Sequence, residues 1–258
     1  MQGEEPLDVL PLWALLALVL LLVLLAVECG YRLGKRAGGG QDEKDTPLGE
    51  MVAATLGLLA FLLAFTFSLA ASRYDTRRQL LLDEANAIGT TYLRAAMLPE
   101  RGDEIQSLLK QYVDIRLDAA RTHDLASVLQ RSDAVQQQLW SHAVAIARRS
   151  PSSIVTGLFV QSLNELIDLH AKRLTASVRN RIPLAIWISV YGVTILSFVV
   201  LGYHAGMVRT RRSPAVLPVA VTFAVVIWLI ADLDRPQEGT LTVSQEALLD
   251  VRRSMNGP

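Results

Sequence analysis

Acidic side chains close to a histidine are the first candidates for chemistry in this sequence. Asp83 and Glu84 lie in one polar segment, and Glu165, Asp168 and His170 lie in a second. Paired carboxylates with a histidine can bind a divalent cation inside a helical bundle. These five residues are therefore predicted to form an ion-binding or partner-binding site, although the Glu-x-x-His motif of carboxylate-bridged bundles is absent.

A structural interpretation competes with this one and is favoured over it. His170 falls on the apolar stripe of its helix, about 100° or more from Glu165 on a helical wheel. Buried charges are usually paired, so the carboxylates are expected to pair with Arg94, Arg116 or Arg173, beside a hydrogen-bonded histidine in the core.

An aromatic face on an apolar segment is the second candidate. Residues at spacings of three, four and seven share one face of a helix, and here they are Ala54, Phe61, Phe65, Ser68 and Ser72. In an oligomer, a ring of phenylalanines can form a hydrophobic constriction, while serine hydroxyls offer hydrogen bonds to a passing ion. Phe61, Phe65, Ser68 and Ser72 are therefore the predicted pore-lining residues.

The alternative is that this face packs against lipid or against another helix. Aromatic residues are ordinary in membrane segments, and Gly57 with the serines permits close helix approach. Ionisable residues are the stronger marker of a pore, and none supports one inside the apolar segments. The packing interpretation is therefore the favoured one for this face.

Asp232 and Asp234 directly follow the fourth apolar segment. Carboxylates at the C-terminal end of a helix oppose its dipole, at a cost of roughly 0.3–1 kcal/mol each. A compensating partner is expected from Arg73, Arg77 or Arg179. The two aspartates form either an acidic ring at a pore mouth or, as the nearby arginines favour, a salt-bridged acidic collar that ties the tail to the helical domain.

Motifs for catalysis are missing from the sequence. No serine lies in a Gly-x-Ser-x-Gly elbow, the histidines lack metal-ligand spacing, and the single cysteine, Cys29, has no histidine near it in sequence. The chain is expected not to be an enzyme and to need no cofactor. Its net charge of zero also argues against nucleic acid as a partner.

Four long apolar segments dominate the sequence of 258 residues, 51% of which are hydrophobic. Each is close to the roughly 20 residues that span a bilayer, and they cover residues 7–27, 51–71, 183–203 and 214–231. The first has acidic flanks and is too long for a signal peptide. The predicted domains are membrane helices one and two (1–71), a helical domain (72–182), membrane helices three and four (183–231) and a C-terminal tail (232–258).

Residues 72–182 show helical periodicity throughout, with breaks near 99–102, 122–124 and 150–151. Three stripes at helical spacing are predicted to be buried: Leu81, Ile88 and Ala95; Ile105, Leu109, Tyr112 and Arg116; and Leu163, Leu166, Ile167, His170 and Leu174. The predicted fold is all-α: four transmembrane helices with a four-helix soluble bundle inserted between the second and third. The first bundle helix is expected to continue membrane helix two, and the last to lead directly into membrane helix three. In the tail, Thr242–Gln245 resembles a capping box that opens a short amphipathic helix with Leu248 and Leu249.

The basic residues of the two short loops predict the orientation in the membrane. By the positive-inside rule both loops are cytoplasmic, because they contain Arg32, Lys35, Arg36 and Lys44, and Arg209, Arg211 and Arg212, respectively. The N-terminus, the helical domain and the tail are then extracytoplasmic.

Several segments together resemble a known family. They are RRQLLLDEANAIGTTYLRAAMLP (77–99), YVDIRLDAAR (112–121), SLNELIDLHAKR (162–173) and DLDRPQEGTLTVSQEALL (232–249). They are similar to the bacterial bestrophin-like membrane family of unknown function. This resemblance implies a multi-pass protein of the bacterial inner membrane. More remotely, it implies kinship with bestrophins, which are pentameric anion channels whose second helix lines an aromatic neck.

Two functions remain open at this point. One is a homo-oligomeric, bestrophin-like ion channel whose second membrane helix lines the pore. The other is a non-conducting membrane sensor or scaffold, whose helical domain binds an inorganic ion or a protein partner. Bestrophins keep the helical insert in the cytosol, whereas the charge pattern of this chain predicts the opposite side.

Overall fold

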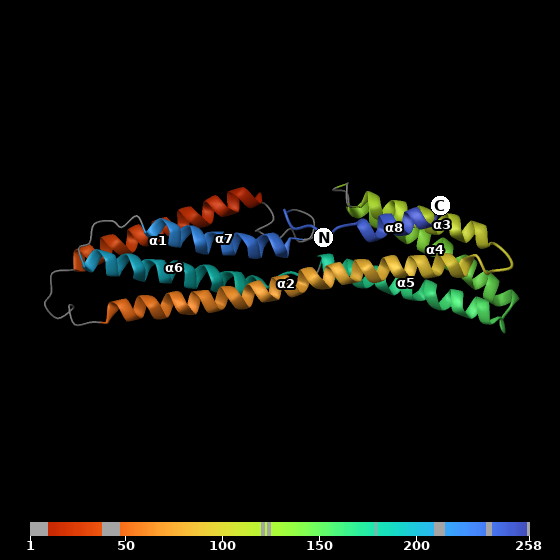
Figure 1. Ribbon diagram of the computed structural model, residues 1–258, viewed down its shortest axis with the longest axis horizontal. Coiled ribbons are helices and arrows are strands. Elements are labelled where there is room, and N and C mark those ends of the chain that lie inside the picture. The colour runs from red at the N-terminus through yellow and green to blue at the C-terminus, as the bar shows by residue number, and fades with distance from the viewer. Residues whose placement is uncertain are drawn as a thin grey trace. The chain divides into compact units, whose positions relative to one another are not determined.

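A computed structural model describes residues 10–37, 47–119, 122, 125–178, 180–208, 215–235 and 239–256. These residues form eight helices and no strand (Figure 1), which agrees with the predicted all-α class. The helices are α1 (Leu12–Ala37), α2 (Leu48–Ala95), α3 (Gly102–Asp118), α4 (Leu125–Arg149), α5 (Ile154–Val178), α6 (Leu184–Met207), α7 (Val216–Asp234) and α8 (Glu246–Ser254).

The chain divides into two compact units. Unit 1 comprises residues Met1–Arg73 and Arg181–Leu241, and unit 2 comprises Tyr74–Asn180 and Thr242–Pro258. One boundary falls inside α2, whose N-terminal part belongs to unit 1 and whose C-terminal part belongs to unit 2. The last helix, α8, groups with α3, α4 and α5 in unit 2.

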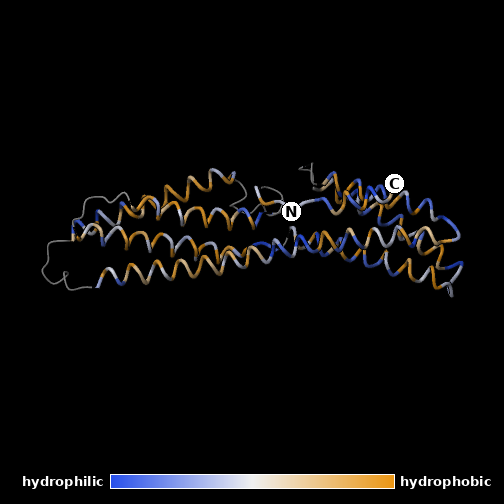
Figure 2. The backbone as a smooth tube through the Cα atoms, in the orientation of Figure 1, coloured by the Kyte–Doolittle hydropathy of each residue, from blue (hydrophilic) through white to orange (hydrophobic). Residues whose placement is uncertain are grey.

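Four helices, α1, α2, α6 and α7, are long and apolar enough to cross a membrane. Figure 2 shows the apolar colouring along α1, α6, α7 and the N-terminal part of α2. These helices match the four predicted apolar segments, except that the predicted starts at Leu7 and Pro214 lie outside the described residues.

Glycines let α1 and α6 pack backbone against backbone. A Cβ atom on Gly30 would lie 2.0 Å from the carbonyl oxygen of Val199, and one on Gly202 would lie 2.1 Å from that of Val27. The same holds one helical turn later for Gly34 and Gly206. Both helices therefore carry a Gly-x-x-x-Gly motif, which lets membrane helices approach closely.

Unit 2 encloses an apolar core. The predicted stripes are buried in it at Ile88 and Ala95 on α2, at Ile105 and Leu109 on α3, and at Leu163 and Leu166 on α5. Leu81 on α2 is buried as well. Leu248 and Met255 from the C-terminal segment join the same core. The helix ends of α2, α3 and α4 fall at the predicted breaks.

Two local predictions are wrong. The last helix of the 72–182 segment does not lead directly into the next one: α5 ends at Val178, and α6 begins at Leu184, after Pro183. Proline lacks the backbone N–H and keeps the preceding residue out of the helical region, which explains the interruption. The capping box is also absent, because α8 begins at Glu246 and its N-cap residue, Gln245, makes no side-chain capping bond.

Candidate functional site

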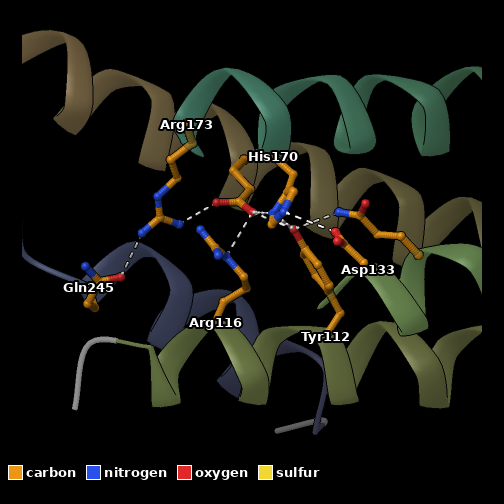
Figure 3. A network of polar contacts seen from close by, with 8 residues as sticks. Tyr112, Arg116, Asp133, His170, Arg173 and Gln245 are labelled. Carbon is orange, nitrogen blue, oxygen red and sulfur yellow. Dashed lines mark hydrogen bonds and ion pairs between the residues drawn. The ribbon is translucent and has the colours of Figure 1, made fainter. Parts of the chain in front are cut away.

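A buried carboxylate, that of Glu84 on α2, lies at the centre of a polar cluster in unit 2. Its side chain is 0% exposed. Arg116 on α3 brings its Nε within 3.2 Å of Glu84 Oε1, and Arg173 on α5 donates from Nη1 to Glu84 Oε2. This is the pairing that the structural interpretation of the sequence predicts. Figure 3 shows the two guanidinium groups approaching from different helices.

Tyr112 on α3 connects the carboxylate to His170 on α5. Its hydroxyl donates to Glu84 Oε1 at 2.7 Å and lies 2.9 Å from His170 Nδ1. The amide Nε2 of Gln136 on α4 donates to the same hydroxyl at 3.4 Å. A hydroxyl has a single proton, so the proton of the His170 contact must come from the imidazole. His170 therefore carries a proton on Nδ1.

The other ring nitrogen of His170 has no hydrogen-bond partner among the residues that the structure describes. Nε2 is buried and lies 4.0 Å from Asp133 Oδ1 on α4, whose side chain is 63% exposed. Figure 3 shows Asp133 and Tyr112 close to the His170 ring. His170 thus separates the buried carboxylate from one that faces solvent.

Burial and the neighbouring charges shift the pKa of Glu84 in opposite directions. Burial alone raises the pKa of this carboxyl, but Arg116, His170 and Arg173 together lower it more, so the pKa lies well below its ordinary value. Burial, followed by the negative charge of Glu84, raises the pKa of Tyr112 well above its usual range. Glu84 is therefore ionised and Tyr112 is protonated at neutral pH.

The C-terminal segment reaches this cluster. Arg173 Nη2 donates to Gln245 Oε1 at 3.3 Å, and Gln245 Nε2 donates to the carbonyl of Val243 at 3.1 Å. Farther along, Arg252 on α8 binds Asp114 on α3 through two hydrogen bonds of 2.6 and 3.0 Å. Gln245, the residue expected to form a capping box, instead joins the segment to the cluster.

The other carboxylates predicted for an ion site lie elsewhere. Asp83 accepts a hydrogen bond from Gln79 on its own helix, whereas Glu165 and Asp168 are exposed. Of the five predicted ion- or partner-binding residues, the structure brings only Glu84 and His170 together, with His170 Nδ1 3.8 Å from Glu84 Oε1. Among the described residues, no three histidine, cysteine or acidic side chains are grouped so that they could hold a metal ion.

The predicted pore-lining residues share an exposed face of α2. Phe61 is 72% exposed and Phe65 is 62% exposed, and Ser68 and Ser72 are exposed as well. The opposite face is buried in unit 1, where Leu59, Leu63, Thr66 and Ala70 lie. The described residues of the chain thus leave Phe61 and Phe65 largely uncovered.

The two aspartates of the predicted acidic collar are both buried and bonded within unit 1. Asp232 Oδ1 accepts from the backbone N–H of Thr240 at 2.8 Å. Asp234 Oδ1 accepts from the backbone N–H of Ile182 at 3.1 Å and lies 4.0 Å from Arg73 Nη1. All three contacts lie within unit 1, and an acidic collar that ties the tail to the helical domain stays a prediction.

Sequence reasoning missed several residues of these sites. Gln136 and Asp133 lie on α4 and belong to no sequence motif, so no signal in the sequence identifies them. The glycine pairs of α1 and α6 do have a signal, because Gly-x-x-x-Gly within an apolar segment indicates close helix packing.

Comparison with known proteins is consistent with this architecture. Residues 18–248 match the family model described as a Bestrophin-like domain. No curated protein matches the chain.

Solved structures share the fold at low sequence identity. A variant of a bacterial bestrophin homologue from Klebsiella pneumoniae superposes with a TM-score of 0.67 at 16% identity, covering 96% of this chain and 99% of that one. A crystal structure described as a membrane protein variant gives 0.69 at 16% identity, with 94% and 97% covered. The family match spans most of the sequence, and the chain therefore belongs to the bacterial bestrophin-like family of membrane proteins.

Proposed function

We propose that this chain is one protomer of a homo-oligomeric ion channel in the bacterial inner membrane, and that the exposed face of α2 lines its pore. The observation that carries the proposal is the exposure of Phe61, Phe65, Ser68 and Ser72, opposite a face that the chain itself buries. Large exposed aromatic side chains are suited to contact with lipid or with a second copy. Membership of the bestrophin-like family favours the second copy.

The proposed topology is the one that the sequence predicts. Residues 1–71 and 183–231 form the four membrane helices, 72–182 form the inserted helical bundle, and 232–258 form the tail. Lys35 and Arg36 in the last turn of α1 favour a cytoplasmic end for that helix. The other loop arginines, 209, 211 and 212, lie outside the described residues. The helical domain is then extracytoplasmic, and its role is not catalytic.

Cysteine labelling tests the orientation. In a Cys29→Ser background, Ser141→Cys puts a thiol on an exposed position of α4. An impermeant maleimide added to intact spheroplasts is expected to label this variant but not an Asp42→Cys variant in the first short loop. The reverse pattern would put the helical domain in the cytosol.

The oligomeric state is the first test of the channel itself. Native mass spectrometry of the protein in lipid nanodiscs is expected to show a closed ring of several chains. A monomer or dimer would remove the central pore, because no face of these apolar helices is polar enough to form a channel within one chain.

Electrical recording in reconstituted bilayers tests the lining residues. Phe65→Ala is expected to change the single-channel conductance several-fold, because it removes a ring of side chains from the constriction. Phe67→Ala is a matched control, since the same change is made on the same helix at a residue that lies on a different face. Equal effects of the two substitutions would contradict a pore on the Phe65 face.

A sensor or scaffold is the second candidate function. It is favoured by the polar cluster of unit 2, where Arg116 Nε and His170 Nε2 are buried without a hydrogen bond to any described part of the chain. This candidate predicts no conductance, together with ligand-dependent stability of the helical domain.

A further inference from the structure

The charges around Glu84 do not balance. One carboxylate faces two guanidinium groups, those of Arg116 and Arg173. Tyr112 adds no negative charge, because its pKa is raised. Asp133 is the next acidic group, but it faces His170 and its side chain is 63% exposed, so solvent screens it. The cluster therefore holds a surplus of one positive charge.

The guanidinium of Arg116 has N–H donors that are not used within the described part of the chain. It is 8% exposed, and its one contact with Glu84 is an ion pair without hydrogen-bond geometry. None of its nitrogens donates a hydrogen bond to a residue that the structure describes. A guanidinium has five N–H donors. Of the three Arg116 nitrogens, Nε is the one that is fully buried without a hydrogen bond to a described residue, and leaving a buried donor of a charged group unsatisfied is expensive. The side chain is thus placed to receive an acceptor that the chain itself does not supply.

The surroundings of Arg116 indicate how a ligand would be held. Arg173 stands beside it, and Figure 3 shows the two guanidinium groups close together, with Gln245 next to Arg173. Arg173 shares its donors between Glu84 and Gln245. The positive charge of Arg116 also helps to lower the pKa of Arg173, after the larger effect of burial. A negative charge between the two arginines would offset the repulsion between their positive charges.

We propose that unit 2 binds a small monovalent anion beside Arg116 and Arg173. One negative charge neutralises the surplus, and the free donors of Arg116 supply the hydrogen bonds. A cation is disfavoured there, because the only buried acidic side chain among the described residues of unit 2 is already paired twice. Since Arg173 also contacts Gln245, the anion would strengthen the attachment of the C-terminal segment. The proposal does not depend on whether the protein conducts.

Thermal unfolding of the purified protein in nanodiscs provides the test. Sodium nitrate replaces sodium gluconate at constant ionic strength, and the helical signal is followed by circular dichroism. Nitrate is expected to raise the Tm by roughly 2–4 °C with saturation, as for a ligand that binds only the folded state. A rise that continues without saturation would be a general salt effect and would overturn the proposal.

Three variants isolate the site, because the nitrate effect is expected to be lost in one, to need less nitrate in another and to stay unchanged in the third. Arg116→Gln leaves one carboxylate with one guanidinium, and is expected to abolish the nitrate effect. Glu84→Gln increases the surplus charge, and is expected to lower the half-saturating nitrate concentration by at least about tenfold. Arg148→Gln removes an exposed arginine of α4 and is expected to leave the effect unchanged.

A nitrate effect that survives in Arg116→Gln would overturn the proposal. If Glu84→Gln does not fold, Arg173→Gln replaces it, with loss of the effect as the expected result and retention as the contradicting one. If none of the arginine variants folds, crystals of the unchanged protein grown in bromide decide the question. An anomalous peak beside Arg116 supports the site, and its absence at saturating bromide overturns it.

Discussion

Units 1 and 2 hold their helices together in different ways. In unit 1, α1 and α6 meet through Gly30, Gly34, Gly202 and Gly206, with backbone touching backbone. In unit 2, large apolar side chains fill the core, and a cluster of charged and polar groups is buried within it. Lipid gives membrane helices no hydrophobic reason to associate, so close van der Waals packing has to hold them. A water-exposed bundle associates by burying apolar area and can then accommodate a paired polar cluster.

The largest effect is expected from the polar cluster. Glu84→Ala leaves two buried guanidinium groups without their carboxylate, and removal of one partner of a buried ion pair costs about 3–5 kcal/mol. The free energy of unfolding of unit 2, measured by urea titration with circular dichroism, is expected to fall by that amount. Asp83→Ala, next to it in sequence, removes a hydrogen bond with Gln79 on the same helix and is expected to cost less than about 1 kcal/mol. Similar losses in the two variants would contradict the central role of Glu84.

Loosening the attachment of the C-terminal segment is expected to give the next largest effect. Leu248 is fully buried in the unit 2 core, and truncation of a buried leucine to alanine costs about 2–5 kcal/mol. Leu248→Ala is expected to increase amide hydrogen exchange across residues 246–254. Leu241→Ala, at an exposed position, is the control. Unchanged protection of α8 in Leu248→Ala would mean that its anchor lies in the polar contacts of Gln245 and Arg252.

Disruption of the glycine contacts between α1 and α6 is expected to give the third largest loss of stability. A methyl group on Gly30 would lie 2.0 Å from the Val199 carbonyl oxygen, so Gly30→Ala forces α1 and α6 apart. Overpacking of this kind costs about 1–3 kcal/mol. Unfolding by SDS titration in mixed micelles is expected to need correspondingly less SDS. Gly57→Ala is the matched control, because nothing lies within 4 Å of its added methyl group, and alanine there is expected to be neutral or slightly stabilising. Equal destabilisation by both changes would rule out the backbone contact as the cause.

Acid titration is expected to give the smallest effect. The pKa of Glu84 is lower in the folded protein than its ordinary value of 4.5. Its contribution to stability is therefore fully present well above pH 4.5, and it is lost as the pH falls below that value toward the folded pKa. At pH 4 the loss is expected to be on the order of 1 kcal/mol relative to pH 7. The measurement is the difference in pH dependence between the unchanged protein and Glu84→Gln, which lacks this titration. Parallel curves for the two proteins would contradict the lowered pKa.

Local sequence patterns predicted much of the molecule. Apolar length identified the four segments whose helices are long and apolar enough to cross a membrane, and the breaks near residues 99–102, 122–124 and 150–151 identified the helix ends of unit 2. The stripe from Leu81 to Ala95 is buried as its spacing predicts. These features depend on residues within a few turns of one another, because helical periodicity and bilayer length are local properties.

Which polar residues meet could be decided only by tertiary structure. Glu84 and Asp83 are neighbours in sequence, yet one is enclosed by Arg116 and Arg173 and the other faces a helical neighbour. Sequence also does not reveal that Gln245 meets Arg173. Such contacts depend on the rotation and packing of helices that are far apart along the chain. The sequence by itself therefore determined the helices, the membrane class and the family, whereas the charge surplus beside Arg116 is a product of the tertiary structure.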